Sequence, residues 1–347
     1  MRTKITFDTM VLVTGGTGLV GAHVLFELVN SGNTVRALQR ENSSKQVVKD
    51  LFNFYSPKGT ELYNSISWVT GDVEDVFSLE KIVSGCDAVF HCAAVVSFSS
   101  SDLNSMLKTN VEGTKHLVDI CLSENVKEFY YVSSVAAMGR NAKTQSVNET
   151  AEWENSKENS GYAISKYQAE MEVWRGGEEG LNVAMVNPTI VIGPGQTQKS
   201  SGTIMKSISS GQKYYTAGEN GYVDARDVAF ILKLLYDQKI FGERYVLCGE
   251  NLSYKEAGDL MAKHLQVKPP TILAKPWLTS LAWRSLAIVG FFTRKRQLLT
   301  KETAQSSHRK TTYENDKARN ELGVTFRTAE QAIKNAVAFF KKHPEHL

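Results

Sequence analysis

Two side chains four residues apart, Tyr162 and Lys166, could together perform acid–base chemistry. On a helix, residues i and i+4 share one face. A free phenol has a pKa of about 10, so it exchanges protons poorly at neutral pH, and a neighbouring ammonium lowers that pKa. Tyr162 is therefore predicted to donate a proton to a carbonyl oxygen or to accept one from an alcohol. An exposed helical pair without a chemical role is the alternative.

A serine that follows a predicted strand could complete this chemistry. Residues 129–133 (FYYVS) form an apolar run typical of a buried strand, and Ser134 comes directly after it. A hydroxyl at that strand end could bond the substrate oxygen and position the substrate for hydride transfer. We therefore predict that Ser134, Tyr162 and Lys166 act together.

A glycine-rich turn lies near the start of the chain. Residues 14–21 (TGGTGLVG) follow the apolar run 11–13 and open a helical pattern, as a dinucleotide site requires. In such a turn Gly15 permits the tight bend, Gly18 lets the backbone approach a pyrophosphate, and Gly21 allows close helix–strand packing. The pyrophosphate would lie at the helix N-terminus, where free N–H groups and the dipole favour anions. A glycine-rich connection without a ligand is the alternative.

The end of the second predicted strand indicates which dinucleotide binds. An NAD site places an Asp or Glu there, about 20 residues past the glycine turn, for the ribose 2′-hydroxyl. Here that position holds Gln39 or Arg40, and the planar guanidinium groups of Arg36 and Arg40 could pair with a 2′-phosphate. We therefore predict a preference for NADP(H), with NAD(H) as the other cofactor. A solvated edge carrying both arginines is the alternative.

Strands and helices alternate through the first half of the chain. The predicted strands are residues 11–13, 34–38, 67–70, 88–92, 129–133 and 183–186, and the predicted helices include residues 20–29, 104–122 and 162–174. This alternation produces βαβ units and a doubly wound parallel sheet with both faces covered. After Asn187-Pro188 the regular alternation of strands and helices ends. The later predictions are a loop with one helix over 196–215, a helix over 226–236, a strand over 244–247 and mostly helix from 253.

An ordered set of motifs resembles the extended short-chain dehydrogenase/reductase family, also called the NAD-dependent epimerase/dehydratase family. The motifs are residues 14–21, 72–73 (DV), 91–94 (HCAA), 110–114 (NVEGT), 132–134 (VSS), 162–166 (YAISK), 187–189 (NPT), 193–195 (GPG) and 222–229 (YVDARDVA). The resemblance covers about residues 10–249. It implies an α/β Rossmann domain made of residues 1–189 plus about 222–250, and a smaller, mostly helical substrate-binding cap made of about 190–221 plus 251–347.

The resemblance also implies roles for matching positions. Lys166 would hydrogen-bond the nicotinamide ribose, and Asn110 would help a proton relay through water near Lys166. Ser134 is chosen over Ser133 because it lies five residues before Gly139, as in relatives. Asp72 could equally cap the next helix, and His91 is expected to be a satisfied strand-end residue. Further cofactor contacts would come from Thr17, Leu19, Val20, Asp72, Val73, Ala93, Ala94, Asn187, Pro188 and Thr189.

Two activities and one binding role fit these residues. A small-molecule ketone or secondary alcohol of apolar character is favoured by the runs 95–98 and 190–192 and by possible lining from Tyr214, Tyr215, Trp277 and Trp283. This resembles dihydroflavonol reductases and 3β-hydroxysteroid dehydrogenases. A nucleotide-sugar epimerase or dehydratase is the alternative, although residues 211–222 lack the Gly-Asp-Gly and Arg-Asp-Phe stretches expected of one. A second alternative is a dinucleotide-binding sensor without activity, which the intact Ser134, Tyr162 and Lys166 disfavour.

The amino-acid composition excludes several other classes of protein. The 347 residues are 42% hydrophobic and 22% charged, which is typical of a globular protein and not of a disordered or coiled-coil one. With 40 Lys and Arg against 37 Asp and Glu, we expect no nucleic-acid partner. Four cysteines without a CxxC pair predict reduced thiols and a cytoplasmic location, and no apolar leader is visible. The seven histidines show no ligand spacing with the cysteines, so no metal is expected.

One apolar stretch raises the question of a membrane. Residues 276–292 (PWLTSLAWRSLAIVGFF) are mostly apolar, contain Arg284, and precede Arg294, Lys295 and Arg296. The stretch is short for a bilayer span of about 20 residues. We expect a helix that closes over an apolar pocket, without membrane contact. A membrane-surface helix is the alternative, because the basic flank would suit anionic lipid.

The family resemblance also implies a homodimer through helices 104–122 and 162–174.

Overall fold

A seven-stranded parallel sheet forms the centre of the protein. The computed structural model describes residues 9–139, 146–156, 158–196, 202–293 and 300–347. The sheet has the order β11-β7-β5-β4-β1-β2-β3, and all neighbours are parallel. Its strands are β1 (Met10–Thr14), β2 (Thr34–Gln39), β3 (Ser67–Thr70), β4 (Ala88–His91), β5 (Glu128–Val132), β7 (Asn182–Pro188) and β11 (Glu243–Leu247). The predicted doubly wound Rossmann sheet is thereby confirmed.

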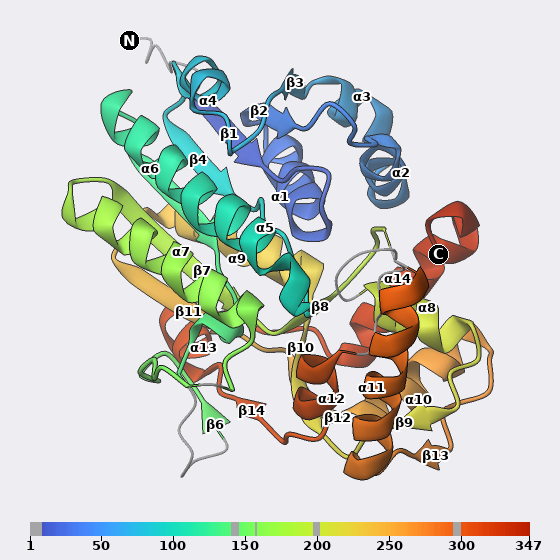
Figure 1. The fold of residues 1–347 in the computed structure, drawn as a ribbon. Helices are drawn as coiled ribbons and strands as arrows, with labels where there is room; N and C mark the ends of the chain where they lie inside the picture. The colour runs from blue at the N-terminus through green and yellow to red at the C-terminus, as the bar shows by residue number, and fades with distance from the viewer. Residues whose placement is uncertain (1–8, 140–145, 157, 197–201, 294–299) are drawn as a thin grey trace, which may run out of the picture.

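Helices cover both faces of this sheet, as Figure 1 shows. One face carries α1 (Leu19–Asn30) and α9 (Ala225–Gln238), which contact each other, and the other carries α4 (Val76–Val83), α6 (Gly113–Ser123) and α7 (Gly161–Glu178). Val11, Leu12 and Val13 are therefore fully buried, which explains their continuous apolar run. The sequence analysis did not identify α2 (Gln46–Tyr55) and α3 (Gly59–Asn64), which lie between β2 and β3.

The predicted helix over 104–122 is interrupted by a wider turn. The structure has α5 (Leu103–Met106), a π-helical segment η2 (Leu107–Glu112) and then α6. Asn110 lies in the π-helical part. Single π turns inside longer helices occur frequently at functional sites, because they displace side chains from their α-helical positions.

Later elements build a second, smaller unit, including strands that the sequence analysis did not identify. A three-stranded sheet joins β8 (Ile190–Ile192), β10 (Glu219–Asp224) and β12 (Glu250–Ser253), with β10 central. Two short parallel pairs join β9 (Tyr214–Tyr215) to β13 (Ile272–Leu273) and β6 (Ser146–Val147) to β14 (Thr312–Tyr313). The later helices are α8 (Gly202–Ser209), α10 (Tyr254–Leu265), α11 (Pro276–Thr293), α12 (Lys301–Ser306), α13 (Asp316–Leu322) and α14 (Ala329–Lys342), followed by the 3-10 turn η4 (Pro344–His346). Two other 3-10 turns, η1 (Ser100–Asp102) and η3 (Val135–Ala137), follow β4 and β5 in the first half of the chain. The exact division into two domains stays a prediction.

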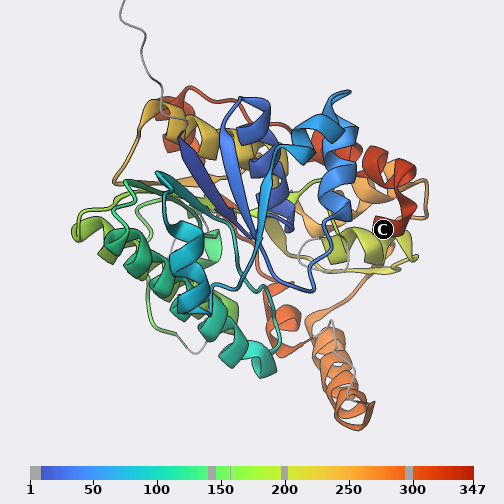
Figure 2. The same cartoon turned by 90° about the horizontal axis from the view of Figure 1, so that it is seen from above.

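Helix α11 does not close over a pocket as expected. It projects outward from the second unit, as Figure 2 shows from above. Trp277 is 65% exposed and Leu281 57% exposed, so these two apolar side chains face outward. None of the helices in the described part of the chain has both the length and the apolar character needed to span a bilayer.

Candidate active site

The glycine turn joins β1 to α1 at the edge of the sheet where ligands bind in such folds. Gly15 has a φ of +68°, and a Cβ there would lie 2.6 Å from the backbone nitrogen of Ala93, which follows β4. A Cβ on Gly21 would lie 2.2 Å from the carbonyl oxygen of Gly15. Both positions therefore require glycine.

Gly18 has a different role from the other two glycines. It is the N-cap of α1 in an extended conformation and provides no side-chain cap. The first-turn N–H groups, which begin at Leu19 and Val20, are thus left for an anionic ligand. The absent Cβ also leaves room for a pyrophosphate to approach, so this turn fits a dinucleotide. Thr17, between these glycines, belongs to the same turn.

Replacing Gly18 by alanine tests this assignment. The extended backbone accepts alanine, and the new Cβ would meet only the Gly15 carbonyl oxygen, at 3.2 Å. We expect the thermal midpoint to change little while the dinucleotide Kd rises about tenfold, which is about 1.4 kcal/mol. Gly258→Ala in α10 is the control, because a Cβ there would make only ordinary contacts, the nearest 3.4 Å from Pro270. If Gly18→Ala binds the dinucleotide as tightly as the parent chain does, the pyrophosphate does not bind at this turn.

His91 belongs to the structural support of the turn. Its Nδ1 lies 2.7 Å from the Thr14 hydroxyl, and its Nε2 lies 2.9 Å from the Thr114 hydroxyl. Thr114 in turn donates to the Asn110 carbonyl oxygen at 2.5 Å. Burial lowers the pKa of His91 to about 3, so the ring is neutral at physiological pH. This agrees with the expectation of a satisfied strand-end histidine.

Ser134 and Tyr162 meet at the carboxyl ends of the strands. Ser134 follows β5, where its Oγ accepts from the Ala136 N–H at 3.1 Å. Tyr162 lies in the first turn of α7, whose N-cap Ser160 accepts from the Ala163 N–H. Burial raises the pKa of Tyr162, and the neighbouring Ser134 hydroxyl opposes that rise. The expected lowering of this pKa by Lys166 is therefore wrong for the protein without ligand.

The position of Lys166 explains the difference. Its side chain is buried, and its ammonium donates to the Tyr131 hydroxyl at 2.6 Å and to the Val132 carbonyl oxygen at 2.8 Å. Burial lowers the pKa of Lys166 to about 7, although the nearby Glu170 carboxylate raises it in part. Lys166 is thus held close to its neutral form, beside the strand end that carries Ser134.

Glu170 is a site residue that the sequence analysis missed. Its carboxylate is fully buried and accepts from Ser133 at 2.5 Å, from Asn187 at 2.9 Å and from Arg244 at 2.8 Å. Ser133 therefore serves this network, and the assignment of Ser134 as the site serine stays a prediction. The available signal was spacing, because Glu170 lies four residues after Lys166 and a buried carboxylate on that face needs a partner.

Asn110 holds the loop that follows β4. Its Oδ1 accepts from the Val95 N–H at 2.7 Å, and its Nδ2 donates to the Val95 carbonyl oxygen at 2.9 Å and to Ser165 at 3.0 Å. The π turn thus places the Asn110 side-chain amide within hydrogen-bond distance of the loop that follows β4. A role for Asn110 in a proton relay stays a prediction.

The two candidate phosphate ligands separate in the structure. Arg36 donates to the carbonyl oxygens of Ile82 at 2.5 Å and Ser84 at 3.0 Å, at the carboxyl end of α4. It lies in the middle of β2, and its side chain points to the sheet face that α4 covers, so its predicted contact with a 2′-phosphate is wrong. Arg40 is exposed directly after β2, and its contact with a 2′-phosphate stays a prediction.

The four residues predicted to contact the cofactor after β3 and β4 differ in burial and in their hydrogen bonds. The Asp72 carboxylate accepts from the Glu74 N–H at 3.1 Å, whereas Asp75 caps α4, so Asp72 is not the helix cap. Val73 is buried in the core. The Ala93 N–H donates to Thr14, while Ala94 is exposed.

The predicted nicotinamide loop is held mainly by the protein. Asn187 Nδ2 bonds the Ser134 carbonyl oxygen at 3.1 Å as well as Glu170, and its buried Oδ1 has no partner among the described residues. Pro188 is buried in β7, and Thr189 donates to the Leu247 carbonyl oxygen. Of these three residues, Asn187 alone combines burial with an open acceptor. That acceptor fits the amide N–H of a nicotinamide.

Two further expectations concern aromatic lining and metal ions. Tyr214 and Trp277 are exposed on the outer face of the second unit, so they do not enclose the site. Away from the elements that carry Tyr162, the side chains of Asp50, His343, Glu345 and His346 bring ligand-type atoms within 4.8 Å of one another. His346 Nε2 lies within hydrogen-bond distance of Asp50 Oδ2 there, at 2.9 Å. The sequence analysis anticipated no such grouping, because Asp50 lies far from the two histidines in the chain.

The fold and site define the class of protein: a dinucleotide-binding α/β enzyme with a serine, a tyrosine and a lysine at the carboxyl edge of its sheet. The sequence pattern of the NAD dependent epimerase/dehydratase family matches residues 11–248. The chain belongs to this family and is an NAD(P)-dependent oxidoreductase of the extended short-chain type.

Named relatives are similar over most of the chain. A Synechocystis protein whose name assigns it to the dihydroflavonol 4-reductases is 30% identical, over 95% of this chain and 94% of its own. Cinnamoyl-CoA reductase 1 of Petunia hybrida is 28% identical, over 73% of this chain and 75% of its own. The crystal structure of gox2253 has a TM-score of 0.79 and 29% identity, over 97% of this chain and 98% of its own.

Proposed function

We propose that the protein interconverts a small apolar ketone and its secondary alcohol, with NADP(H) as the preferred cofactor. The observation that carries this proposal is the placement of Ser134 beside Tyr162, with the buried Lys166 one helical turn further along α7. The reductase names of the relatives support it. A sensor that only binds the dinucleotide would not need Ser134, Tyr162 and Lys166 in this arrangement.

The residues divide the work of the reaction. When bound, the nicotinamide supplies or accepts the hydride. Ser134 donates a hydrogen bond to the substrate oxygen and orients it, and Tyr162 gives its hydroxyl proton to that oxygen during reduction. Lys166, one helical turn after Tyr162, would stabilise the phenolate when its side chain is protonated.

The surroundings of Tyr162 favour an apolar substrate. The ring of Phe98 meets the ring of Tyr162 edge-on, with centroids 6.0 Å apart, and the Phe98 side chain is 44% exposed. Val95 and Val96 lie in the same loop and are partly buried. An apolar carbonyl compound that reaches Tyr162 would contact these side chains, whereas a diphosphate would find no cation among them.

Absorbance of NADPH tests the activity directly. The protein is mixed with NADPH and a panel of apolar ketones, aldehydes and nucleotide sugars. Oxidation of NADPH with the apolar ketones is the expected result. A change in the nucleotide sugars themselves, without net oxidation of NADPH, would replace the proposal by the epimerase alternative. Dinucleotide binding without any turnover would replace it by the sensor.

Arg40→Ala tests the cofactor preference. Because Arg40 is exposed at the end of β2, the change removes a guanidinium that could pair with the 2′-phosphate. We expect KM for NADPH to rise about tenfold and KM for NADH to stay unchanged, as for one lost charge-assisted contact. Arg36→Gln is the matched control, since Arg36 bonds the end of α4, and it should change neither KM. A wild-type preference for NADH would contradict the assignment.

A further inference from the structure

The outer end of the second unit exposes a cluster of apolar side chains. Five of the nine large hydrophobic side chains that are exposed in the described part of the chain lie here: Tyr214 (48%), Ile272 (45%), Leu273 (43%), Trp277 (65%) and Leu281 (57%). Ile272 pairs with Tyr214 in the β9–β13 ribbon, and α11 begins three residues after Leu273. We call these five residues the outer apolar patch.

Two large apolar residues of helix α11, Trp277 and Leu281, face away from the protein. Trp277, Leu281 and Arg284 follow the i, i+4, i+7 spacing of one helix face, and all three are exposed. On the opposite side the Thr279 hydroxyl lies 2.9 Å from His308 Nε2 and is buried. A globular protein normally buries the apolar stripe of a helix, so an outward stripe indicates a partner.

Positive charge surrounds the outer apolar patch. Residues 202–218 and 260–286 contain six Lys and Arg and no Asp or Glu, although the whole chain is almost balanced at 40 to 37. Lys213, Lys275 and Arg284 are exposed beside the patch, and no carboxylate in the described ranges pairs with them. Apolar side chains with a cationic border match the headgroup region of an anionic bilayer.

We propose that this surface binds the face of an anionic phospholipid membrane. Trp277 and Leu281 enter the boundary between headgroups and acyl chains, and Lys213, Lys275 and Arg284 lie against lipid phosphates. The protein lies on the bilayer, because no described helix could cross it. A second copy is a poorer occupant, since a twofold interface would bring the same cations of both copies together.

Vesicle co-sedimentation of the full chain tests the proposal. The expected result is binding to vesicles of phosphatidylcholine with phosphatidylglycerol, weak binding to phosphatidylcholine alone, and release by salt. The double variant Trp277→Ser/Leu281→Ser should lower the partition coefficient at least about tenfold. Lys213→Gln/Lys275→Gln should lower it about fivefold for each cation removed.

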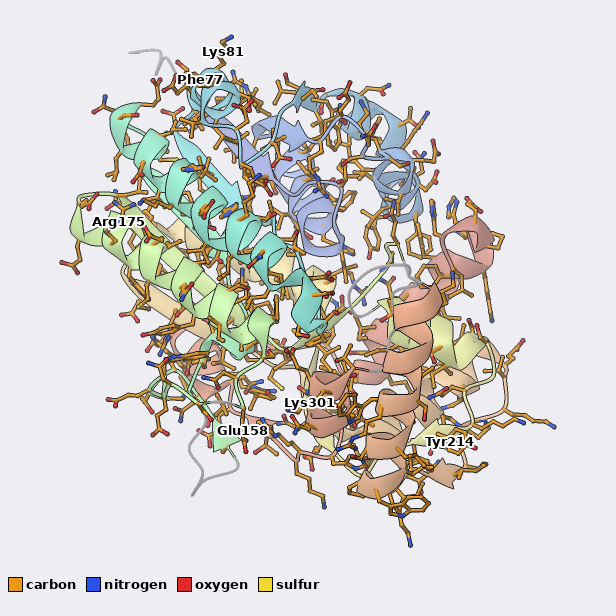
Figure 3. All side chains as sticks on the ribbon, in the orientation of Figure 1. Phe77, Lys81, Glu158, Arg175, Tyr214 and Lys301 are labelled. Atoms are coloured by element: carbon orange, nitrogen blue, oxygen red, sulfur yellow. The ribbon has the colours of Figure 1, made fainter. Side chains whose placement is uncertain are left out.

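Matched controls lie at the opposite end of the molecule. Figure 3 labels Phe77 and Lys81 on α4, far from Tyr214 on β9. Phe77 is 80% exposed and Lys81 is exposed, so Phe77→Ser and Lys81→Gln make the same chemical changes outside the patch and should leave binding unchanged.

Three results would overturn the proposal. The first is no binding to either kind of vesicle, and the second is an equal loss of binding in the control variants. The third is a dimer in solution that Trp277→Ser/Leu281→Ser converts to a monomer without any vesicle binding by the parent chain, which would assign the surface to a second copy. None of the variants alters Tyr162 or the glycine turn, so turnover of a soluble substrate reports separately on the proposed function.

Discussion

Replacing Tyr162 by phenylalanine is expected to lower kcat about a thousandfold, within the range that general acid–base groups contribute. The phenyl ring keeps its edge-on contact with Phe98, so the local packing survives. Only the hydroxyl beside Ser134, which carries the transferred proton, is lost. Because the glycine turn is untouched, the Kd of the dinucleotide should change by less than about twofold.

The next tyrosine of the same helix provides the control. Tyr167 stacks on Trp153, with ring centroids 4.4 Å apart, and contributes no hydroxyl to the site. Tyr167→Phe should therefore keep the kcat of the parent chain. Steady-state rates and equilibrium dinucleotide titrations are measured side by side. If Tyr162→Phe keeps more than about one tenth of the activity, Tyr162 is not the proton donor.

Replacing Glu170 by alanine is expected to lower the free energy of unfolding by about 3 kcal/mol, as breaking a buried ion pair does. The change removes the shared acceptor of Ser133, Asn187 and Arg244. The Ser133 hydroxyl and Arg244 Nη1 would lose their acceptor while buried or partly buried, whereas Asn187 would keep its bond to the Ser134 carbonyl oxygen. Donors left without an acceptor cost more than the pair itself contributes. Loss of the carboxylate also removes an influence that raises the pKa of Lys166, so that pKa should fall from about 7 to a lower value.

Arg175 on the same helix serves as the comparison for Glu170. It forms ion pairs with Asp119, Glu172 and Glu179, but its side chain is one-third exposed. Figure 3 labels Arg175 at the end of α7, away from the second unit. Arg175→Ala should cost less than about 1 kcal/mol in urea unfolding, as surface pairs do. Equal losses for Glu170→Ala and Arg175→Ala would show that the buried network does not stabilise the fold.

Much of the fold could be predicted because its signals are local. Each strand of the large sheet lies within two residues of a predicted apolar run, since parallel strands buried on both faces have continuous apolar sequences. Helices α2 and α3 and the small sheet of β8, β10 and β12 were missed. Strand β12 (ENLS), for example, carries little apolar pattern, and its pairing with β10 is formed by residues about 30 positions away.

The sequence by itself determined the parts of the site that depend on short spacing. The glycine turn, the Tyr162–Lys166 pair and Ser134 at a strand end are all set within a few residues, because one turn or one helix face fixes them. Only the tertiary structure decided which partners these groups meet. Glu170 finds Arg244 74 residues away, Arg36 is drawn to the end of α4, and Lys166 donates to Tyr131. Such contacts join elements that the sheet order brings together, so no local pattern contains them.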